Sequence, residues 1–147
     1  MLDTDTYLLW LYDWNLSGLK NWGDAKLWAA GLTVGGATAG DWRLPEIGEY
    51  ADLWSDAGSS LLGLQSSFTG VQSIDYWSGT EYAPTPALTW TFSTLDSFQG
   101  IVDKNRALYA VAVRPGDVTA SVPEPQTLAL VLLALGATAV ARRRRSR

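Results

Sequence analysis

Carboxylates are the side chains best suited to catalysis here, because the 147 residues contain no histidine and no cysteine. This excludes a Ser-His-Asp triad, a thiol nucleophile and an imidazole or thiolate zinc site. A glycosidase would need two carboxyl groups several ångströms apart in a cleft. Asp75 and Glu81, on either side of an aromatic segment, are the better candidates for such a pair. Glu46, Glu49 and Asp52 share the outer face of a predicted helix, so we expect them to be solvated, and we predict that the chain is not an enzyme.

Sugar binding fits the composition better than catalysis. The chain contains 8 Trp and 6 Tyr, and aromatic rings offer an apolar face beside a polar tip. Short polar side chains near such rings would complete a carbohydrate site. The candidate glycan-binding residues all lie in the second half of the chain, and they are Asp75, Glu81, Tyr82, Trp90, Asn105 and Tyr109. The alternative is that these aromatic rings fill the core.

The C-terminal segment has a different composition from the rest. It begins with Pro123, Glu124 and Pro125, continues without a charge from Thr127 to Ala141, and then carries an arginine block at 142–147. Fifteen helical residues rise about 22 Å, less than the ~30 Å of a bilayer core, and terminal arginines can snorkel to the headgroups. We predict a transmembrane helix over 127–141. Its stop signal is the run Arg142, Arg143, Arg144 and Arg145, which marks the cytoplasmic side.

Charge divides the chain at the same place. Residues 1–121 carry six Lys/Arg and fourteen Asp/Glu, a net charge of −8, whereas residues 122–147 carry five Arg and one Glu, a net charge of +4. An acidic body argues against nucleic acid as a partner, because phosphate binding needs a basic face. About 120 residues suffice for one domain, and without cysteine its stability must come from the hydrophobic core rather than from disulfides.

The three parts of the tail, in this order, resemble the PEP-CTERM sorting signal of Gram-negative bacteria. The resemblance implies an exosortase partner that processes the chain at Pro123–Pro125. It also implies an inner-membrane precursor that later reaches the cell surface or the extracellular matrix. An exported chain needs a signal peptide, yet the acidic start at residues 1–5 does not fit one. We expect the true start to lie upstream, and the alternative is a non-functional gene product that never leaves the cytoplasm.

Apolar periodicity predicts two helices in the first half, after a buried strand at Tyr7–Tyr12. The first helix is capped by Asn21 and closed by Gly35-Gly36, and Trp22, Ala25, Ala29 and Leu32 form its inner face. The second begins near Pro45 and ends at Gly58. Its inner face consists of Ile47, Tyr50, Ala51 and Trp54.

The second half changes to a period of two, which predicts strands. They are expected at 76–78, 88–92, 98–102 and 108–113, with a loop at 83–86 and a hairpin loop at 103–106. In the strand at 88–92, Thr89 and Thr91 alternate with apolar residues, as in a half-exposed strand. The predicted fold class is α+β, with two N-terminal helices, a mainly antiparallel sheet and the C-terminal transmembrane helix.

Four short motifs resemble the Lcl C-terminal domain family: Asn21–Ala25, Asp41–Pro45, Tyr76–Thr80 and Ala112–Gly116. The resemblance implies a domain over 6–116, a linker at 117–121 and a distant likeness to the C-type lectin and formylglycine-generating enzyme fold. It also implies a place on bacterial surfaces, with links to adhesion and to sulfated polysaccharides. Trp42 and Trp77 are expected in the core, and Arg43 is expected to be half-buried against carbonyls or a carboxylate.

The resemblance supplies no catalytic residue and no metal site. Loop carboxylates leave calcium open as a cofactor, but the Glu-Pro-Asn type signature of calcium-binding lectins is missing, so none is predicted. We expect an exported envelope protein whose domain associates with exopolysaccharide or surface glycans. The alternatives are a structural envelope protein without a ligand and a carboxylate-based hydrolase.

Overall fold

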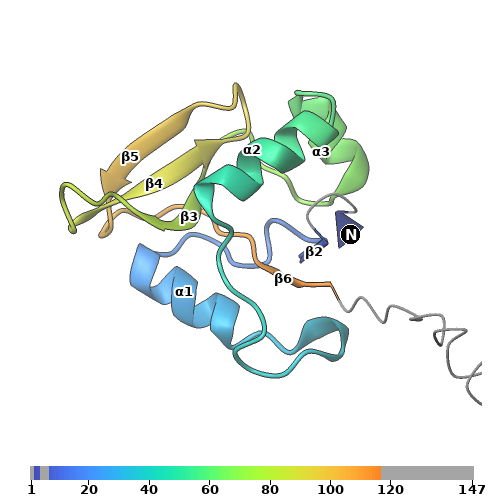
Figure 1. Cartoon of the computed structure of the whole chain (residues 1–147), viewed down its shortest axis with the longest axis horizontal. Coiled ribbons are helices and arrows are strands. Elements are labelled where there is room, and N and C mark those ends of the chain that lie inside the picture. The colour runs from blue at the N-terminus through green and yellow to red at the C-terminus, as the bar shows by residue number, and fades with distance from the viewer. Residues whose placement is uncertain (1, 4–6, 117–147) are drawn as a thin grey trace, which may run out of the picture. The chain divides into compact units, whose positions relative to one another are not determined.

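The computed structural model of this chain describes residues 2–3 and 7–116 (Figure 1). The chain divides into two units after Gly116, and the described part belongs to the first. The predicted sorting motif, transmembrane helix and arginine block lie outside the described residues. No helix within the described ranges is long and apolar enough to cross a membrane.

The described part has three α-helices, one more than the sequence predicted. They are α1 (Trp22–Ala30), α2 (Ile47–Asp56) and α3 (Leu61–Ser67), with a 3-10 turn, η1, at Val34–Gly36. The Asn21 cap is confirmed, since its side chain accepts a 2.9 Å bond from the backbone N–H of Asp24. Helix α1 ends earlier than predicted, at Ala30 with Gly31 as its C-cap, and the predicted Gly35-Gly36 stop falls in η1 instead. The short α3 was missed because seven residues carry too little periodicity to stand out.

Two antiparallel three-stranded sheets accompany the helices, which confirms the α+β class. One sheet has the order β1-β2-β6, and the other has the order β3-β4-β5. The strands are β1 (Leu2–Asp3), β2 (Leu8–Trp10), β3 (Asp75–Glu81), β4 (Leu88–Ser93), β5 (Gln99–Asp103) and β6 (Val113–Pro115). Pairing of β2 with β6 brings the two ends of the domain side by side.

The predicted strand at 108–113 is wrong for most of its length. Only Val113 enters β6, whereas Leu108 and Tyr109 make single bridges to Lys20 and Tyr76. Residues 110–112 are fully buried. The turn at 103–106 is present, but it joins β5 to this buried crossing segment and not to a paired strand.

The predicted exposure of β4 is reversed. Thr89 and Thr91 are buried, with exposed fractions of 0% and 1%, whereas Leu88 and Trp90 are only half-buried. Successive side chains of a strand point to opposite faces. Phe92 packs on Tyr50 of α2 at 5.1 Å between ring centroids, so the burial of the threonines shows that the opposite face is covered as well. The alternation of polar and apolar residues in β4 therefore does not indicate which side chains are exposed to solvent.

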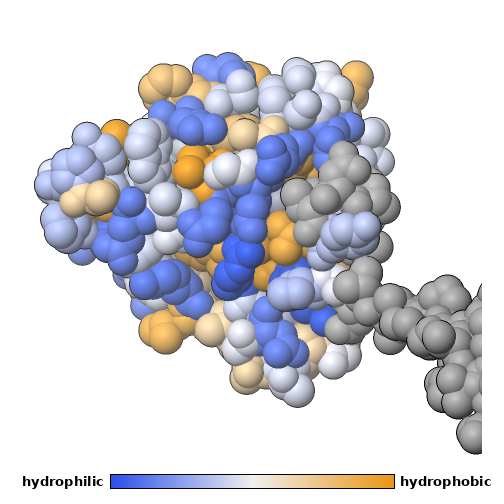
Figure 2. Space-filling view, viewed as in Figure 1, coloured by the Kyte–Doolittle hydropathy of each residue, from blue (hydrophilic) through white to orange (hydrophobic). Residues whose placement is uncertain are grey.

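The core is an aromatic cluster. Trp10, Trp14 and Tyr76 lie in series, with 5.9 Å between the first two ring centroids and 5.1 Å between the last two. Trp42 and Trp77 are buried, which confirms the prediction for both. Figure 2 shows a band of hydrophilic residues along α2 and the segment leading into it, with apolar residues on both sides.

Candidate functional site

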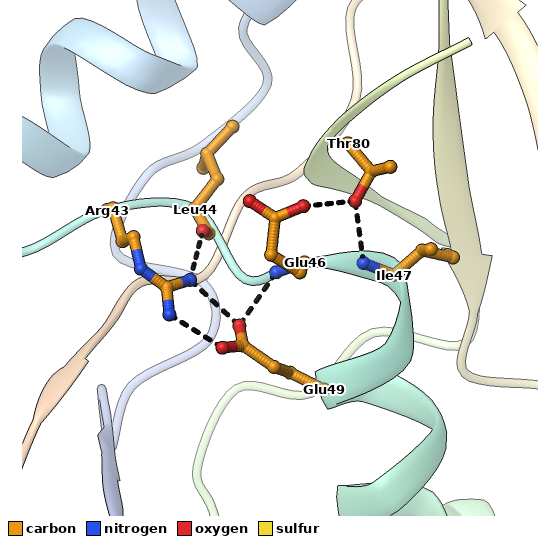
Figure 3. A network of polar contacts seen from close by, with 6 residues as sticks. All are labelled: Arg43, Leu44, Glu46, Ile47, Glu49 and Thr80. Atoms are coloured by element: carbon orange, nitrogen blue, oxygen red, sulfur yellow. Dashed lines mark hydrogen bonds and ion pairs between the residues drawn. The ribbon is translucent and has the colours of Figure 1, made fainter. Parts of the chain in front are cut away.

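The Asp41–Pro45 motif ends in a polar network that fixes the start of α2 (Figure 3). Arg43 makes two bonds to Glu49, 2.8 Å from Nη1 to Oε2 and 2.6 Å from Nη2 to Oε1. Its Nη1 also donates to the Leu44 carbonyl at 3.1 Å. The predicted carbonyl and carboxylate partners are confirmed, but the side chain is 43% exposed and not half-buried as predicted. The bond to Glu49 raises the pKa of Arg43 above its usual value.

Glu46 links the same network to strand β3. Its backbone N–H donates to Glu49 Oε2 at 2.7 Å, closing a capping box. The hydroxyl of Thr80 accepts from the N–H of Ile47 at 2.9 Å and donates to a Glu46 carboxylate oxygen. Glu46 is exposed as predicted, but neither it nor Glu49 is simply solvated, since both hold α2 in place. Asp52 is exposed.

A pocket of about 200 Å³ opens beside this network, between α1 and the segment that enters α2. Pockets for drug-sized ligands usually have a volume of at least ~300 Å³, so this one has room only for a small group. Its floor is apolar and its rim carries charges of both signs. The lining residues are Lys26, Ala30, Trp42, Arg43, Leu44, Glu46 and Gly79.

Lys26 connects the pocket to a second group of charges around Trp22. The ammonium groups of Lys26 and Lys104 lie 3.6 Å and 4.2 Å from the Trp22 ring centroid. Lys104 pairs with Glu81 at 2.8 Å, and that hydrogen bond, more than the nearby positive charges, lowers the pKa of Glu81. Within the described ranges Lys26 makes no ion pair with a carboxylate. Its charge does contribute to the lowered pKa of Glu81, but from a longer distance than the direct contact of Lys104.

The structure brings only some of the six predicted glycan-binding residues together. Tyr82 and Trp90 touch edge to face, with 5.8 Å between ring centroids. Glu81 directly precedes Tyr82 and reaches Lys104, the residue before Asn105. These residues lie near the end of the sheet where β3 finishes and β4 begins.

The other two predicted residues lie elsewhere. Asp75, at the start of β3, is opposite Ser93, and Tyr109 packs on Tyr76. Because Asp75 and Glu81 are six positions apart on one strand, they are separated by roughly 20 Å. Glycosidase carboxyls lie roughly 5–9.5 Å apart, so this pair does not form such a site. No cluster of three or more metal-binding side chains occurs within the described part of the chain.

Sequence reasoning missed the group formed by Trp22, Lys26 and Lys104. The spacing of Trp22 and Lys26 places them one helical turn apart, a signal that was present in the sequence. Lys104 could not be found in this way, because it comes from the turn after β5 and meets Trp22 only in the folded chain.

Comparison with known proteins identifies both parts of the chain. The family model of the Lcl C-terminal domain matches residues 1–114, and that of the PEP-CTERM protein-sorting motif matches residues 121–145. No curated protein matches the chain. The sorting motif supports export by an exosortase-type route and implies a secreted protein that crosses the membrane of a Gram-negative bacterium. Since the first match covers most of the sequence, the chain belongs to the Lcl C-terminal domain family.

Proposed function

We propose that the domain binds an acidic polysaccharide of the cell envelope, with Lys26 as its main contact. One observation carries the proposal: the Lys26 ammonium lies at the Trp22 ring and also lines the pocket, and among the described residues it makes no direct ion pair, since Glu81 acts on it only from a longer distance. A carboxylate or sulfate group of a sugar would supply that partner. Arg43, by contrast, is already paired with Glu49.

The pocket walls suit the rest of a sugar residue. Ala30, Trp42 and Leu44 offer apolar surface to the C–H groups of a pyranose ring, while Glu46 on the rim can accept from its hydroxyl groups. Residues 1–121 carry a net charge of −8, which as a whole repels a polyanion. The attraction must therefore come from the positive charge at Lys26. Such binding weakens as salt screens the charges.

The Tyr82–Trp90 pair supports a second contact along the polysaccharide. Both rings are half-buried and lie edge to face. A half-exposed aromatic face stacks on sugars without requiring a charge. We expect this contact to tolerate salt, which distinguishes it from the contact at Lys26.

Affinity electrophoresis tests the proposal. The fragment 1–116 is suitable, because its buried core lies wholly between Leu8 and Val113 and because the arginines of the tail would bind any polyanion. We expect gels containing polygalacturonate or dextran sulfate to retard the fragment and gels containing neutral dextran to retard it less. Equal mobility in all gels would contradict polysaccharide binding and would favour the alternative, a structural envelope protein without a ligand.

We also propose that the exported chain reaches the cell surface and is no enzyme. Export rests on the sorting motif at 121–145, and the surface location is tested by the mass of the mature chain in its host. Loss of the arginine block supports exosortase processing, whereas a chain that ends at Arg147 in the inner membrane contradicts it. Hydrolase activity that disappears in Asp75→Asn or Glu81→Gln would contradict the non-enzymatic assignment.

A further inference from the structure

Strand β5 is an open edge of the β3-β4-β5 sheet. Its one partner within the described residues is β4, and it forms the outer border of that sheet in Figure 1. Ser93 N–H bonds to the Phe98 carbonyl, and Lys104 N–H bonds to the Ala87 carbonyl. Because antiparallel pairing alternates, the even-numbered residues of β5 bond inward, and the N–H and C=O groups of Gln99 and Ile101 point outward.

Charged side chains, which usually prevent strand pairing, occur only at the end of this edge, at Asp103 and Lys104. No lysine or proline lies between Phe98 and Val102, although such residues are common on exposed edges. Instead, large apolar side chains are exposed there: Phe98 is 67% exposed and Ile101 is 39% exposed. An unprotected apolar edge tends to be covered by another strand.

The sequence of β5 matches a second copy of itself. In a two-fold antiparallel pair centred on Ile101, Gln99 lies opposite Asp103 of the copy, and Phe98 lies opposite Lys104. No like charges face each other, and the Gln99 amide can donate to the Asp103 carboxylate. Within each copy, Ile101 of β5 lies opposite Trp90 of β4. The contact would therefore place the Trp90–Ile101 pairs of the two copies side by side in one apolar strip.

We infer that two copies of this chain associate through β5 and so extend the sheet across the pair. Five residues of strand span only about 17 Å. The contact is therefore small, and dimerisation depends on the local concentration of the chain. Lys26 takes no part in this association, whereas Trp90 belongs both to the strip and to the proposed second glycan contact, so cross-linking is measured without any polysaccharide.

Cysteine cross-linking of the full chain tests the inference directly, because the natural sequence has no cysteine. Residues opposite each other in an antiparallel ladder have Cα atoms about 4.5–5.5 Å apart, within the range that a disulfide spans. We expect Ile101→Cys to form a covalent dimer on mild copper–phenanthroline oxidation. Leu27→Cys, which is 73% exposed on α1, is the control for random collisions.

The register gives a sharper test. Gln99→Cys and Asp103→Cys should each cross-link poorly alone and well when the two variants are mixed. The inference is overturned if Ile101→Cys yields no more dimer than Leu27→Cys. It is equally overturned if the mixture of the other two yields no more than either variant alone. Circular dichroism establishes that each variant is folded.

Discussion

Arg43 and Glu49 face each other through two hydrogen bonds of 2.8 Å and 2.6 Å, across the turn that begins α2. The pair connects the segment that pairs with Val113 to the first turn of the helix. It therefore holds one wall of the pocket in place.

Arg43→Lys should destabilise the domain by about 1 kcal/mol. Lysine cannot reproduce the two-pronged contact with Glu49 together with the bond to the Leu44 carbonyl, and a partly exposed pair contributes modestly. Urea unfolding of the fragment 1–116 measures the change. Arg106→Lys is the control, because that exposed side chain makes no comparable ion pair. Equal effects of the two substitutions would show that the geometry at Arg43 contributes nothing.

Two glycines in helices should respond to alanine in opposite ways. A Cβ atom at Gly63 would lie 1.7 Å from the Ala57 carbonyl oxygen, whereas one at Gly48 meets nothing within 4 Å. Gly63→Ala should therefore destabilise the domain by at least ~1–3 kcal/mol. Gly48→Ala should stabilise it by up to roughly 0.5 kcal/mol. Thermal unfolding of both variants measures the change in stability. An unchanged stability of Gly63→Ala would contradict the close packing of α3.

Two buried threonines of β4 allow a controlled comparison, because only one of them makes a side-chain hydrogen bond. Thr89 Oγ1 donates to the Thr80 carbonyl at 2.7 Å, while Thr91 Oγ1 has no hydrogen-bond partner in the described structure. Thr89→Val should cost about 1–2 kcal/mol in unfolding free energy, and Thr91→Val should be neutral or stabilising. Chemical denaturation of both variants gives the comparison. The reverse order would contradict the hydrogen bond assigned to Thr89 and its absence at Thr91.

Stability should fall in alkali because of Tyr50 and Tyr76. Burial raises the pKa of Tyr76 from 10.0 to about 12, and it raises the pKa of Tyr50 well above 10.0. The folded state keeps these protons while the unfolded state releases them, so the stability present below pH 10 is lost as pH rises. For Tyr76 the loss runs from pH 10 towards about 12, with a slope of up to ~1.4 kcal/mol per pH unit.

Urea unfolding across this pH range tests the alkaline effect. Tyr76→Phe should flatten the slope, because it removes the ionisable group. Tyr12→Phe is the control, since Tyr12 is 58% exposed and its loss should leave the slope unchanged. Identical slopes in all three proteins would rule out Tyr76 as a source.

The sequence predicted those features that depend on neighbouring residues. The Asn21 cap and the partners of Arg43 were correct, because Asp24 and Glu49 lie within one or two helical turns. The exposure of Thr89 and Thr91 could not be read from alternation, since it depends on what covers the second face of the sheet.

The features that the sequence did not predict depend on contacts between residues far apart in the chain. Lys104 meets Trp22 although the two are distant in sequence, so the charged group at Lys26 appeared only in the structure. The crossing segment at 108–112 looks like a strand in sequence but pairs through single bridges, because its neighbours Lys20 and Tyr76 belong to different parts of the fold.

The most direct test of the proposed function is the dissociation constant of the fragment 1–116 for oligogalacturonate, with two charge-matched variants. Lys26→Gln should weaken binding about tenfold, the equivalent of roughly 1.4 kcal/mol, and should reduce the salt dependence. Lys20→Gln removes the same charge outside the pocket lining and should change the constant less than about twofold. Equal losses in both variants, or none in Lys26→Gln, would contradict a glycan site at Lys26.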